Sequence, residues 1–365
     1  MIEENTGRRG NVKMNYAVDG YVVKFLGRTC SYKGIRWCGL SGSGIAFKVT
    51  GTYARIKIVG DDTTAGRVTE GCARIGIYLN GKRVIDRVVT QPEEVITVFD
   101  GEKTQSAEVM VIKLSECAMS TVGIAEIQTD GKPDPLPDKK RKIEFIGDSI
   151  TCGYGVDLED PKTAFRTDTE DVTRAYAYKT AAALDADYSM VSYSGYGIFS
   201  GYTESGEPNK AERVPPYYEK VGFSYAKPMG ELELSDISWD FGAFCPDLIV
   251  VNLGTNDDSY CAGIKEREEA YSSAYAEFLE TVRKHNSNAR ILAVLGLMGE
   301  RLCPAMQAAV SLYQEKTGDQ NIDTFCLKEQ AEEDGRVSSY HPTERSHAKA
   351  AEALVAKIKS VMEWT

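Results

Sequence analysis

The most constraining feature of this sequence is a change of hydrophobic pattern on either side of a proline-rich segment, residues 130–138. Before it, in residues 21–129, short runs of β-branched and aromatic residues alternate with glycine-bearing turns. One of these turns, Asn80-Gly81, is a strong hairpin signal. After the segment, runs rich in isoleucine and valine alternate with helical stretches. The two patterns predict an antiparallel β-sandwich followed by an α/β domain.

The boundary between the two domains is predicted at the prolines. Residues 130–138 contain three of them, and proline removes the N–H that a strand or helix would use, so we expect a linker and no regular element. We assign residues 1–132 to the β-sandwich, 133–142 to the linker and 143–365 to the α/β domain. The length of 365 residues agrees with two domains, because one core rarely grows beyond roughly 250–300 residues.

The second half has the pattern of a parallel sheet covered by helices on both faces. Its predicted strands are residues 143–146, 188–193, 248–253, 291–295 and 322–327, and a last amphipathic helix is predicted from about residue 343. Sheets of this kind place ligands at the carboxyl ends of their strands. The residues that follow each strand are therefore the candidates for a functional site.

Polar or glycine-rich turns follow three of the predicted strands. Ser149 follows the first strand at the start of a helix, Gly195 and Gly197 follow the second, and Asn256 follows the third. A serine there can present its hydroxyl at the sheet edge, glycines can expose backbone N–H groups, and an asparagine can donate its side-chain amide. Each residue also has an ordinary structural explanation as a helix cap or part of a tight turn.

The chain contains three histidines, His285, His341 and His347. His341 precedes Pro342, which predicts a loop at the entrance of the final helix, beyond the last strand. His285 is expected at a solvated helix C-terminus. His347 follows His341 by six residues, about 240° around a helix, so the two do not form a helical metal site. A structural role remains the alternative for each of them.

The order of these motifs is more informative than any one of them. Gly147-Asp148-Ser149, a later glycine, Gly254-Thr255-Asn256-Asp257 and a C-terminal His341-Pro342 resemble the SGNH hydrolase superfamily over essentially the whole second domain. Residues 146–155 are similar to carbohydrate esterase family 2 in particular, and residues 112–116 resemble the leading domain of that family. The resemblance implies a jelly-roll-like sandwich followed by a three-layer, flavodoxin-like SGNH hydrolase domain with a parallel sheet.

The resemblance also implies a role for each motif residue. Ser149 is then the nucleophile, and His341 is the base that takes its proton. The backbone N–H groups of Ser149 and Gly195 and the side-chain amide of Asn256 form the oxyanion hole. Gly197 is the rival of Gly195, because the second motif is short in this chain.

The residue that orients His341 departs from the superfamily pattern. Many SGNH enzymes carry an aspartate three residues before the histidine, where this chain has Ser338. Some members of the suggested family use a Ser–His dyad in which a backbone carbonyl orients the imidazole, and we expect that arrangement here. Asp334 is the alternative carboxylate. Asp148 is expected to hold the turn by hydrogen bonding, with no direct part in the chemistry.

The function implied by the resemblance is a serine esterase that removes O-acetyl groups from xylan- or mannan-derived carbohydrates through an acyl-enzyme. The alternatives are a lipase or thioesterase on the same scaffold, and an inactive carbohydrate-binding protein. Tyr196, Tyr260 and Tyr340 adjoin the motifs, and Trp239 lies in the long aromatic insertion 198–244, so these rings are candidates for stacking on sugars. They could equally pack the insertion or face another subunit.

Composition bounds the partners and the compartment. The net charge of −11, with no basic run beyond residues 139–142, makes nucleic acid an unexpected partner, and no apolar stretch is long enough to span a membrane. No metal or organic cofactor is expected, and the oligomeric state stays open. Residues 1–20 lack the apolar region of a secretory signal, and nine scattered cysteines predict reduced thiols in the cytoplasm. A secreted protein that had lost its leader would have the same composition.

Overall fold

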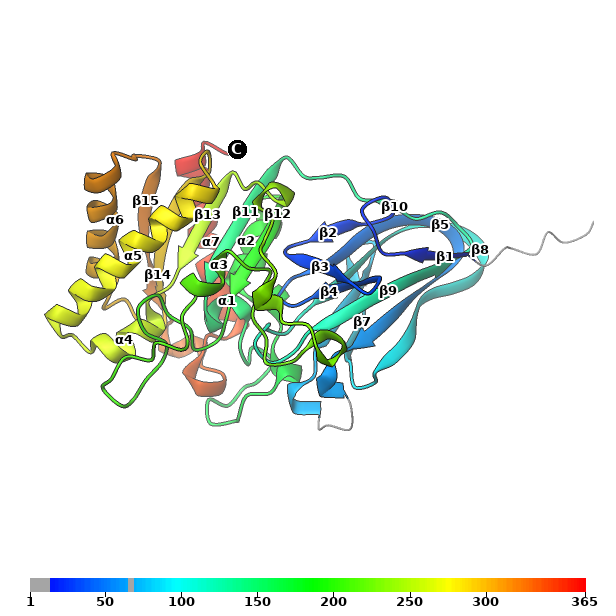
Figure 1. The fold of residues 1–365 in the computed structure, drawn as a ribbon, viewed down its shortest axis with the longest axis horizontal. Coiled ribbons are helices and arrows are strands. Elements are labelled where there is room, and N and C mark those ends of the chain that lie inside the picture. The colour runs from blue at the N-terminus through cyan, green and yellow to red at the C-terminus, as the bar shows by residue number, and fades with distance from the viewer. Residues whose placement is uncertain (1–13, 65–68) are drawn as a thin grey trace, which may run out of the picture.

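The computed structural model describes residues 14–64 and 69–365 and shows an all-β domain beside an α/β domain (Figure 1). The fold class predicted from the sequence is thereby confirmed. Residues 1–13, which include much of the segment inspected for a secretory signal, lie outside the described residues. Among the helices that are described, none is long and apolar enough to cross a bilayer.

The first domain is a ten-stranded antiparallel sheet that curls on itself. Its strands are β1 (Met14–Ala17), β2 (Lys24–Leu26), β3 (Thr29–Tyr32), β4 (Ile35–Cys38), β5 (Gly44–Gly60), β6 (Arg74–Leu79), β7 (Lys82–Val88), β8 (Glu93–Lys113), β9 (Val122–Thr129) and β10 (Asp134–Pro135). The main strand order is β3-β4-β9-β5-β8-β6-β7, with β1 paired to β9 and both β2 and β10 paired to β5.

The long strands β5 and β8 explain why the domain has one curled sheet and not the two separate sheets of an ordinary sandwich. They contain 17 and 21 residues and pair with each other, so they run through both layers of the sandwich. Their register shifts between Gly51 and Tyr53, and such irregularities bend a sheet. The predicted hairpin at Asn80-Gly81 is confirmed, because both residues have positive φ and join β6 to β7.

The proline-rich segment is more ordered than the sequence predicts. Asp134 and Pro135 form the two-residue strand β10 against Lys48 and Phe47 of β5, so the segment is not entirely without regular structure. A proline is tolerated there because β10 lies at an edge, where a missing N–H breaks no ladder. The next strand, β11 (Arg141–Gly147), begins inside the predicted linker because Arg141 already pairs with β12.

The second domain is built on a five-stranded parallel sheet of order β12-β11-β13-β14-β15. The remaining strands are β12 (Ala186–Ser192), β13 (Leu248–Asn252), β14 (Arg290–Leu297) and β15 (Ile322–Glu329), all at the predicted positions. The helices are α1 (Ser149–Cys152), α2 (Tyr176–Ala183), α3 (Pro215–Tyr218), α4 (Thr255–Cys261), α5 (Lys265–His285), α6 (Cys303–Thr317) and α7 (Glu344–Met362).

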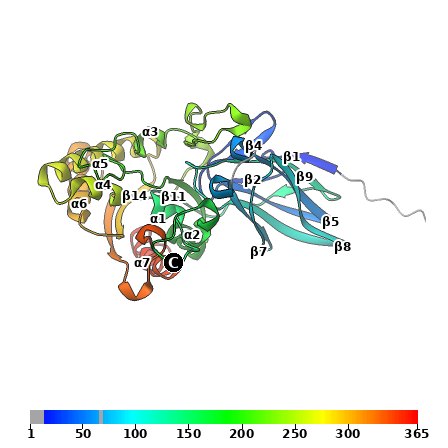
Figure 2. The same cartoon turned by 90° about the horizontal axis from the view of Figure 1, so that it is seen from below.

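Helices cover both faces of the parallel sheet, as Figure 2 shows for α5 and α7. Helices α2 and α7 share one core with the sheet, and α5 and α6 share the other. Strand β13 is buried along its whole length for this reason. The strand order reverses at β11, which lies between β12 and β13, and ligands of such sheets bind at the carboxyl end of that point. Ser149 follows β11 there.

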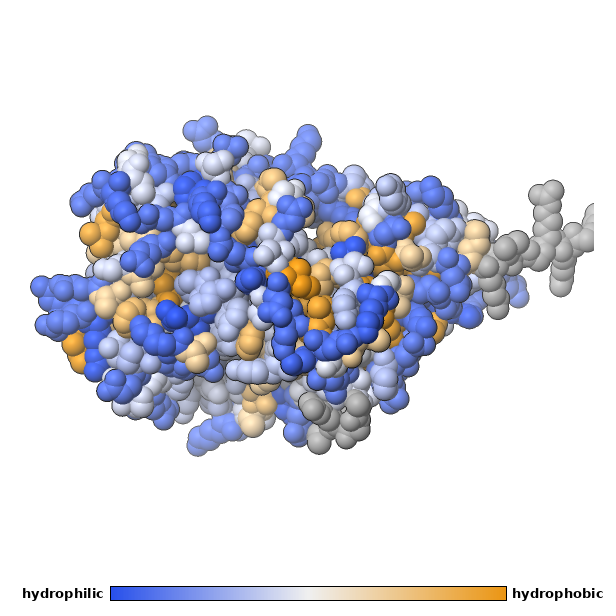
Figure 3. Space-filling view, viewed as in Figure 1, coloured by the Kyte–Doolittle hydropathy of each residue, from blue (hydrophilic) through white to orange (hydrophobic). Residues whose placement is uncertain are grey.

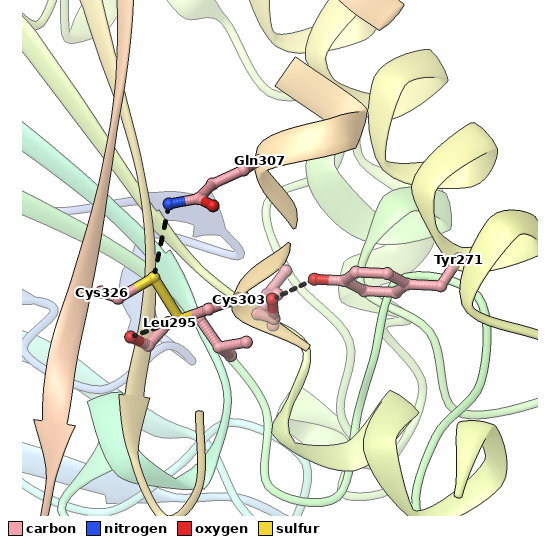
Figure 4. Close-up of a disulfide and its surroundings, with 6 residues drawn as sticks. Tyr271, Leu295, Cys303, Gln307 and Cys326 are labelled. Atoms are coloured by element: carbon pink, nitrogen blue, oxygen red, sulfur yellow. Dashed lines mark hydrogen bonds between the residues drawn. A yellow bond between two sulfur atoms is a disulfide. The ribbon is translucent and has the colours of Figure 1, made fainter. Parts of the chain in front are cut away.

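The prediction that all cysteines are reduced is wrong for one pair. Cys303 of α6 and Cys326 of β15 form a disulfide, with their Cα atoms 6.2 Å apart (Figure 4). The two residues are 23 positions apart, and only the packing of α6 on the sheet brings them together. A disulfide is more typical of an oxidising compartment than of the cytoplasm, so the cytoplasmic location stays a prediction.

The two domains are joined by buried polar contacts. The Arg28 guanidinium is fully buried, bonds the Glu144 carboxylate of β11 at 3.2 Å, and donates to the carbonyls of Tyr218 and Lys220. Near the amino end of β12, Lys24 forms a 2.6 Å ion pair with Asp187. Hydrophobic residues also gather on the visible face between the domains (Figure 3). A buried interface of this kind indicates that the domains pack as one unit.

Candidate active site

Ser149 lies at the carboxyl end of β11, where the chain turns into α1. Asp148 caps this helix, and its carboxylate accepts a 3.0 Å hydrogen bond from the Ile150 N–H, which is the turn-holding contact expected of it. Gly147 is required just before, because a Cβ there would lie 2.1 Å from the Thr151 hydroxyl. Ser149 itself is only 5% exposed.

His341 reaches Ser149 from the loop before α7, 192 residues further along the chain. Its Nε2 lies 2.7 Å from the Ser149 Oγ, and its Nδ1 lies 3.0 Å from the Ser338 carbonyl oxygen. A carbonyl can only accept, so Nδ1 carries the proton and Nε2 is free to accept from the serine hydroxyl. Asp334 instead forms ion pairs with Arg345 and Lys349. The structure therefore places the Ser338 carbonyl, and not the Asp334 carboxylate, at the imidazole Nδ1.

Burial sets the protonation state of His341. It lowers the pKa of the imidazole from 6.5 to about 4, while the hydrogen bonds to the backbone of Ser338 and Ser339 partly oppose this effect. The imidazole is therefore neutral at pH 7, as a general base must be. The Tyr154 ring contributes to the burial, with its centroid 4.3 Å from that of His341 and 3.9 Å from that of Phe165.

Three candidate oxyanion donors lie at the ends of β11, β12 and β13. The N–H groups of Ser149 and Gly195 donate to no acceptor among the described residues, whereas the Gly197 N–H donates to the Glu212 carbonyl at 3.2 Å. This leaves Gly195, with its left-handed φ of 83°, as the available glycine donor. The Asn256 side chain uses one amide hydrogen on the Tyr196 carbonyl, at 2.8 Å, and keeps a second.

Asp257 organises the loop that follows Gly195, a role that sequence reasoning missed. Its carboxylate accepts hydrogen bonds from the N–H groups of Ile198, Phe199 and Ser200, at 2.7–3.0 Å. Burial raises the pKa of Asp257 to about 6, although these three N–H groups oppose the shift. The sequence signal for this role was the position of Asp257 directly after Asn256 in the same motif. Tyr154, which packs on His341, was also missed, and its signal was its position five residues after Ser149.

The four aromatic candidates for sugar binding lie in different surroundings. Tyr196 is buried against Tyr217 and Phe223, and the Tyr260 ring packs on Phe199. Tyr340, beside His341, is the most open of the four, with 61% of its surface exposed.

Trp239 lies beside a residue of the N-terminal domain. Its ring packs on the Arg28 guanidinium, at 5.3 Å, and borders the groove between the domains. Arg28 bonds Glu144 in the middle of β11, well short of the carboxyl end where Ser149 lies. Trp239 therefore lies at the domain interface, and its part in sugar binding stays a prediction. The sequence showed only that it belongs to an aromatic insertion, not where that insertion folds.

The described residues contain no cluster of three or more His, Cys, Asp or Glu side chains arranged to hold a metal ion. A hydroxyl beside a neutral imidazole, with free donors that follow the neighbouring strand ends, supplies the parts that acyl transfer needs.

Comparison with known families agrees with this geometry. Residues 145–349, more than half of the chain, match the GDSL-like lipase/acylhydrolase family. The chain belongs to that family. Residues 25–137 match the carbohydrate esterase 2 N-terminal domain, so both halves of this family member agree with the resemblance to carbohydrate esterase family 2.

Two curated relatives are similar to this GDSL-like chain. The cellulase/esterase CelE of Acetivibrio thermocellus is 32% identical over 236 residues, covering 64% of this chain and 26% of that protein. The chain thus spans about a quarter of the length of CelE. An acetylxylan esterase/glucomannan deacetylase of Cellvibrio japonicus is 28% identical over 283 residues, covering 74% of this chain and 72% of that protein.

Solved structures extend the similarity to both domains. The acetyl xylan esterase Est2A of the rumen bacterium Butyrivibrio proteoclasticus has a TM-score of 0.86 at 26% identity, covering 97% of this chain and 99% of that one. A family two carbohydrate esterase of Clostridium thermocellum, solved in complex with cellohexaose, has a TM-score of 0.79 at 25% identity, covering 94% of this chain and 100% of that one. The two-domain arrangement is therefore shared with carbohydrate esterases.

Proposed function

We propose that this chain is a serine esterase that removes acetyl groups from carbohydrates, with Ser149 as nucleophile and His341 as base. The observation that carries the proposal is the 2.7 Å approach of the His341 Nε2 to the Ser149 Oγ, with Nδ1 bound to the Ser338 carbonyl. This is the orientation that a nucleophile–base pair requires. The carbonyl provides the orientation that an aspartate provides in a triad, but without its negative charge.

The proposed reaction has two balanced halves. The Ser149 hydroxyl gives its proton to the His341 Nε2 as Oγ bonds the acetyl carbon, and the carbonyl oxygen becomes an oxyanion held by the donors of Ser149, Gly195 and Asn256. Collapse breaks the bond to the sugar oxygen, which takes the proton from Nε2 and leaves as the alcohol. Water then repeats the sequence on the acetyl-serine and releases acetate.

The relatives support a carbohydrate substrate. Two of those named above are an acetylxylan esterase/glucomannan deacetylase and an acetyl xylan esterase, and one related structure contains cellohexaose. We extend this to acetylated xylan- or mannan-derived oligosaccharides here. The disulfide between Cys303 and Cys326 agrees better with a protein that meets such substrates outside the cytoplasm than with the predicted cytoplasmic location.

The test is acetate release from a panel of acetylated xylo- and manno-oligosaccharides, with the products mapped by NMR. We expect release by the wild type and none above background by Ser149→Ala. A parallel series of nitrophenyl acetate and octanoate separates the alternatives. Preference for octanoate would indicate a lipase or thioesterase, and carbohydrate binding with no hydrolysis of any ester would indicate an inactive binding protein.

A further inference from the structure

A loop of the N-terminal domain, residues 114–121 between β8 and β9, is built into the α/β domain. The Leu114 carbonyl accepts a 3.1 Å hydrogen bond from the Val172 N–H, and the Ala118 carbonyl accepts a 2.8 Å bond from the Tyr225 N–H. Residues 114–117 are all at most 2% exposed. This loop of the N-terminal domain is therefore buried against the α/β domain and bonded to its backbone.

Glu116, in this loop, reaches the segment that carries the glycine oxyanion donor. Its carboxylate accepts a 3.0 Å hydrogen bond from the Ser194 N–H, one residue before Gly195. Its own N–H donates to the Glu170 carboxylate at 2.6 Å, and the Lys113 ammonium donates to its carbonyl at 2.6 Å. With its backbone held on both sides, the side chain has a fixed direction toward Ser194.

A carboxylate in this place is costly, which indicates a role beyond packing. Burial raises the pKa of Glu116, because its charge is poorly solvated, although the hydrogen bonds from Ser194 oppose this. No lysine or arginine forms an ion pair with the carboxylate in the part of the chain that the structure describes, and the nearby Lys113 donates to carbonyls. A neutral side chain of similar volume would serve the stability of the domain interface better.

The Gly195 N–H depends on its neighbours for its direction. Glycine at a φ of 83° has no side chain to hold it, and its N–H has no acceptor among the described residues. Asn256 and Asp257 fix the chain on the downstream side, at Tyr196 and residues 198–200. On the upstream side, the Tyr193 N–H donates to the Gly147 carbonyl at 3.4 Å and the Tyr193 carbonyl accepts from the Tyr196 N–H at 3.3 Å. The Ser194 N–H, next to Gly195, donates to the Glu116 carboxylate, which is the side chain that holds this peptide.

We propose that Glu116 is a positioning residue that aims the Gly195 N–H at the oxyanion, so that the N-terminal domain completes the active site. The proposal rests on the esterase function proposed above. Glu116 touches no reacting atom and acts through the Ser194–Gly195 backbone. Loss of the Glu116 acceptor is expected to lower kcat and leave KM little changed, because a misaligned Gly195 N–H stabilises the oxyanion of the transition state less well and hardly affects the bound substrate.

The test compares Glu116→Gln, Glu116→Asp and Glu116→Leu in nitrophenyl acetate hydrolysis. Gln keeps an acceptor at the same reach, so kcat should stay within about threefold of the wild type, whereas Asp is shorter by one methylene and Leu has no acceptor, so both should lose roughly 10–100-fold in kcat with KM within about twofold. Comparing Asp with Gln keeps the test valid if the Leu variant fails to fold.

The matched control is Lys24→Met, which removes another contact between the domains. Lys24 pairs with Asp187 near the amino end of β12, the end opposite Ser194. This variant should melt at a lower temperature and keep the wild-type kcat of its folded fraction. If the Asp and Leu variants keep wild-type kcat, or lose rate only in proportion to folded protein, the positioning role is wrong. If the wild type hydrolyses no ester, the esterase proposal fails instead.

Discussion

Replacement of Asn256 by alanine tests the oxyanion hole most sharply. The side chain is 7% exposed and offers two amide hydrogens, one of which is used on the Tyr196 carbonyl at 2.8 Å. The second is free to bind the developing oxyanion in a site that largely excludes water. Removal of one such donor costs on the order of 3–4 kcal/mol in the barrier, which is a loss of roughly 10²–10³ in kcat.

The same substitution also leaves the Tyr196 carbonyl without its donor, which is expected to lower stability by about 1 kcal/mol. Asn286→Ala is the matched control, because Asn286 is equally exposed at 7% and its amide donates to the Tyr218 hydroxyl and the Val282 carbonyl, away from Ser149. The assay is kcat for nitrophenyl acetate together with a urea unfolding curve for each variant. If Asn256→Ala turns over within about threefold of Asn286→Ala, the oxyanion assignment is refuted.

Three further predictions concern the base, its orientation and the domain interface. The value of kcat/KM should fall as the pH drops through the pKa of His341, which burial lowers to about 4. Tyr154→Ala should admit water to the imidazole and raise the pKa read from this profile toward 6.5, and an unchanged pKa would contradict the argument. Asp334→Asn should keep kcat within about threefold, since Asp334 binds Lys349 and not the imidazole; a large loss in the same ester assay would restore it as the orienting group. Arg28→Met should lower the free energy of unfolding in urea by roughly 3–5 kcal/mol, because it leaves the Glu144 carboxylate buried and unpaired, and a loss below about 1 kcal/mol would contradict this.

Much of the second domain could be predicted because its signals are local. The five strands have continuous apolar runs, and Ser149, Asn256 and His341 follow a motif order that resembles a known superfamily. For the group that orients His341, the sequence predicted a backbone carbonyl with Asp334 as the alternative. It could not identify the Ser338 carbonyl, because every residue has a backbone oxygen. The structure decides between them through the turn that precedes His341.

The features that could not be predicted all depend on contacts between distant segments. The passage of β5 and β8 through both layers of the sandwich depends on strand length and register, and the Cys303–Cys326 disulfide depends on helix packing. Trp239 was a candidate for sugar binding only because it lies in the aromatic insertion, and the sequence could not show that this insertion folds partly against the N-terminal domain. Glu116 lies in a different domain from the motif that it supports, so no spacing rule could connect them.

The most direct measurement of the Ser149–His341 pair is covalent labelling. The wild type and His341→Ala are incubated with an alkyl fluorophosphonate, and the intact mass and the modified peptide are determined by mass spectrometry. We predict one adduct on Ser149 of the wild type, and labelling of His341→Ala that is slower by at least about a thousandfold because the hydroxyl then has no base. An adduct on another residue, or equal labelling of the two proteins, would contradict the assignment.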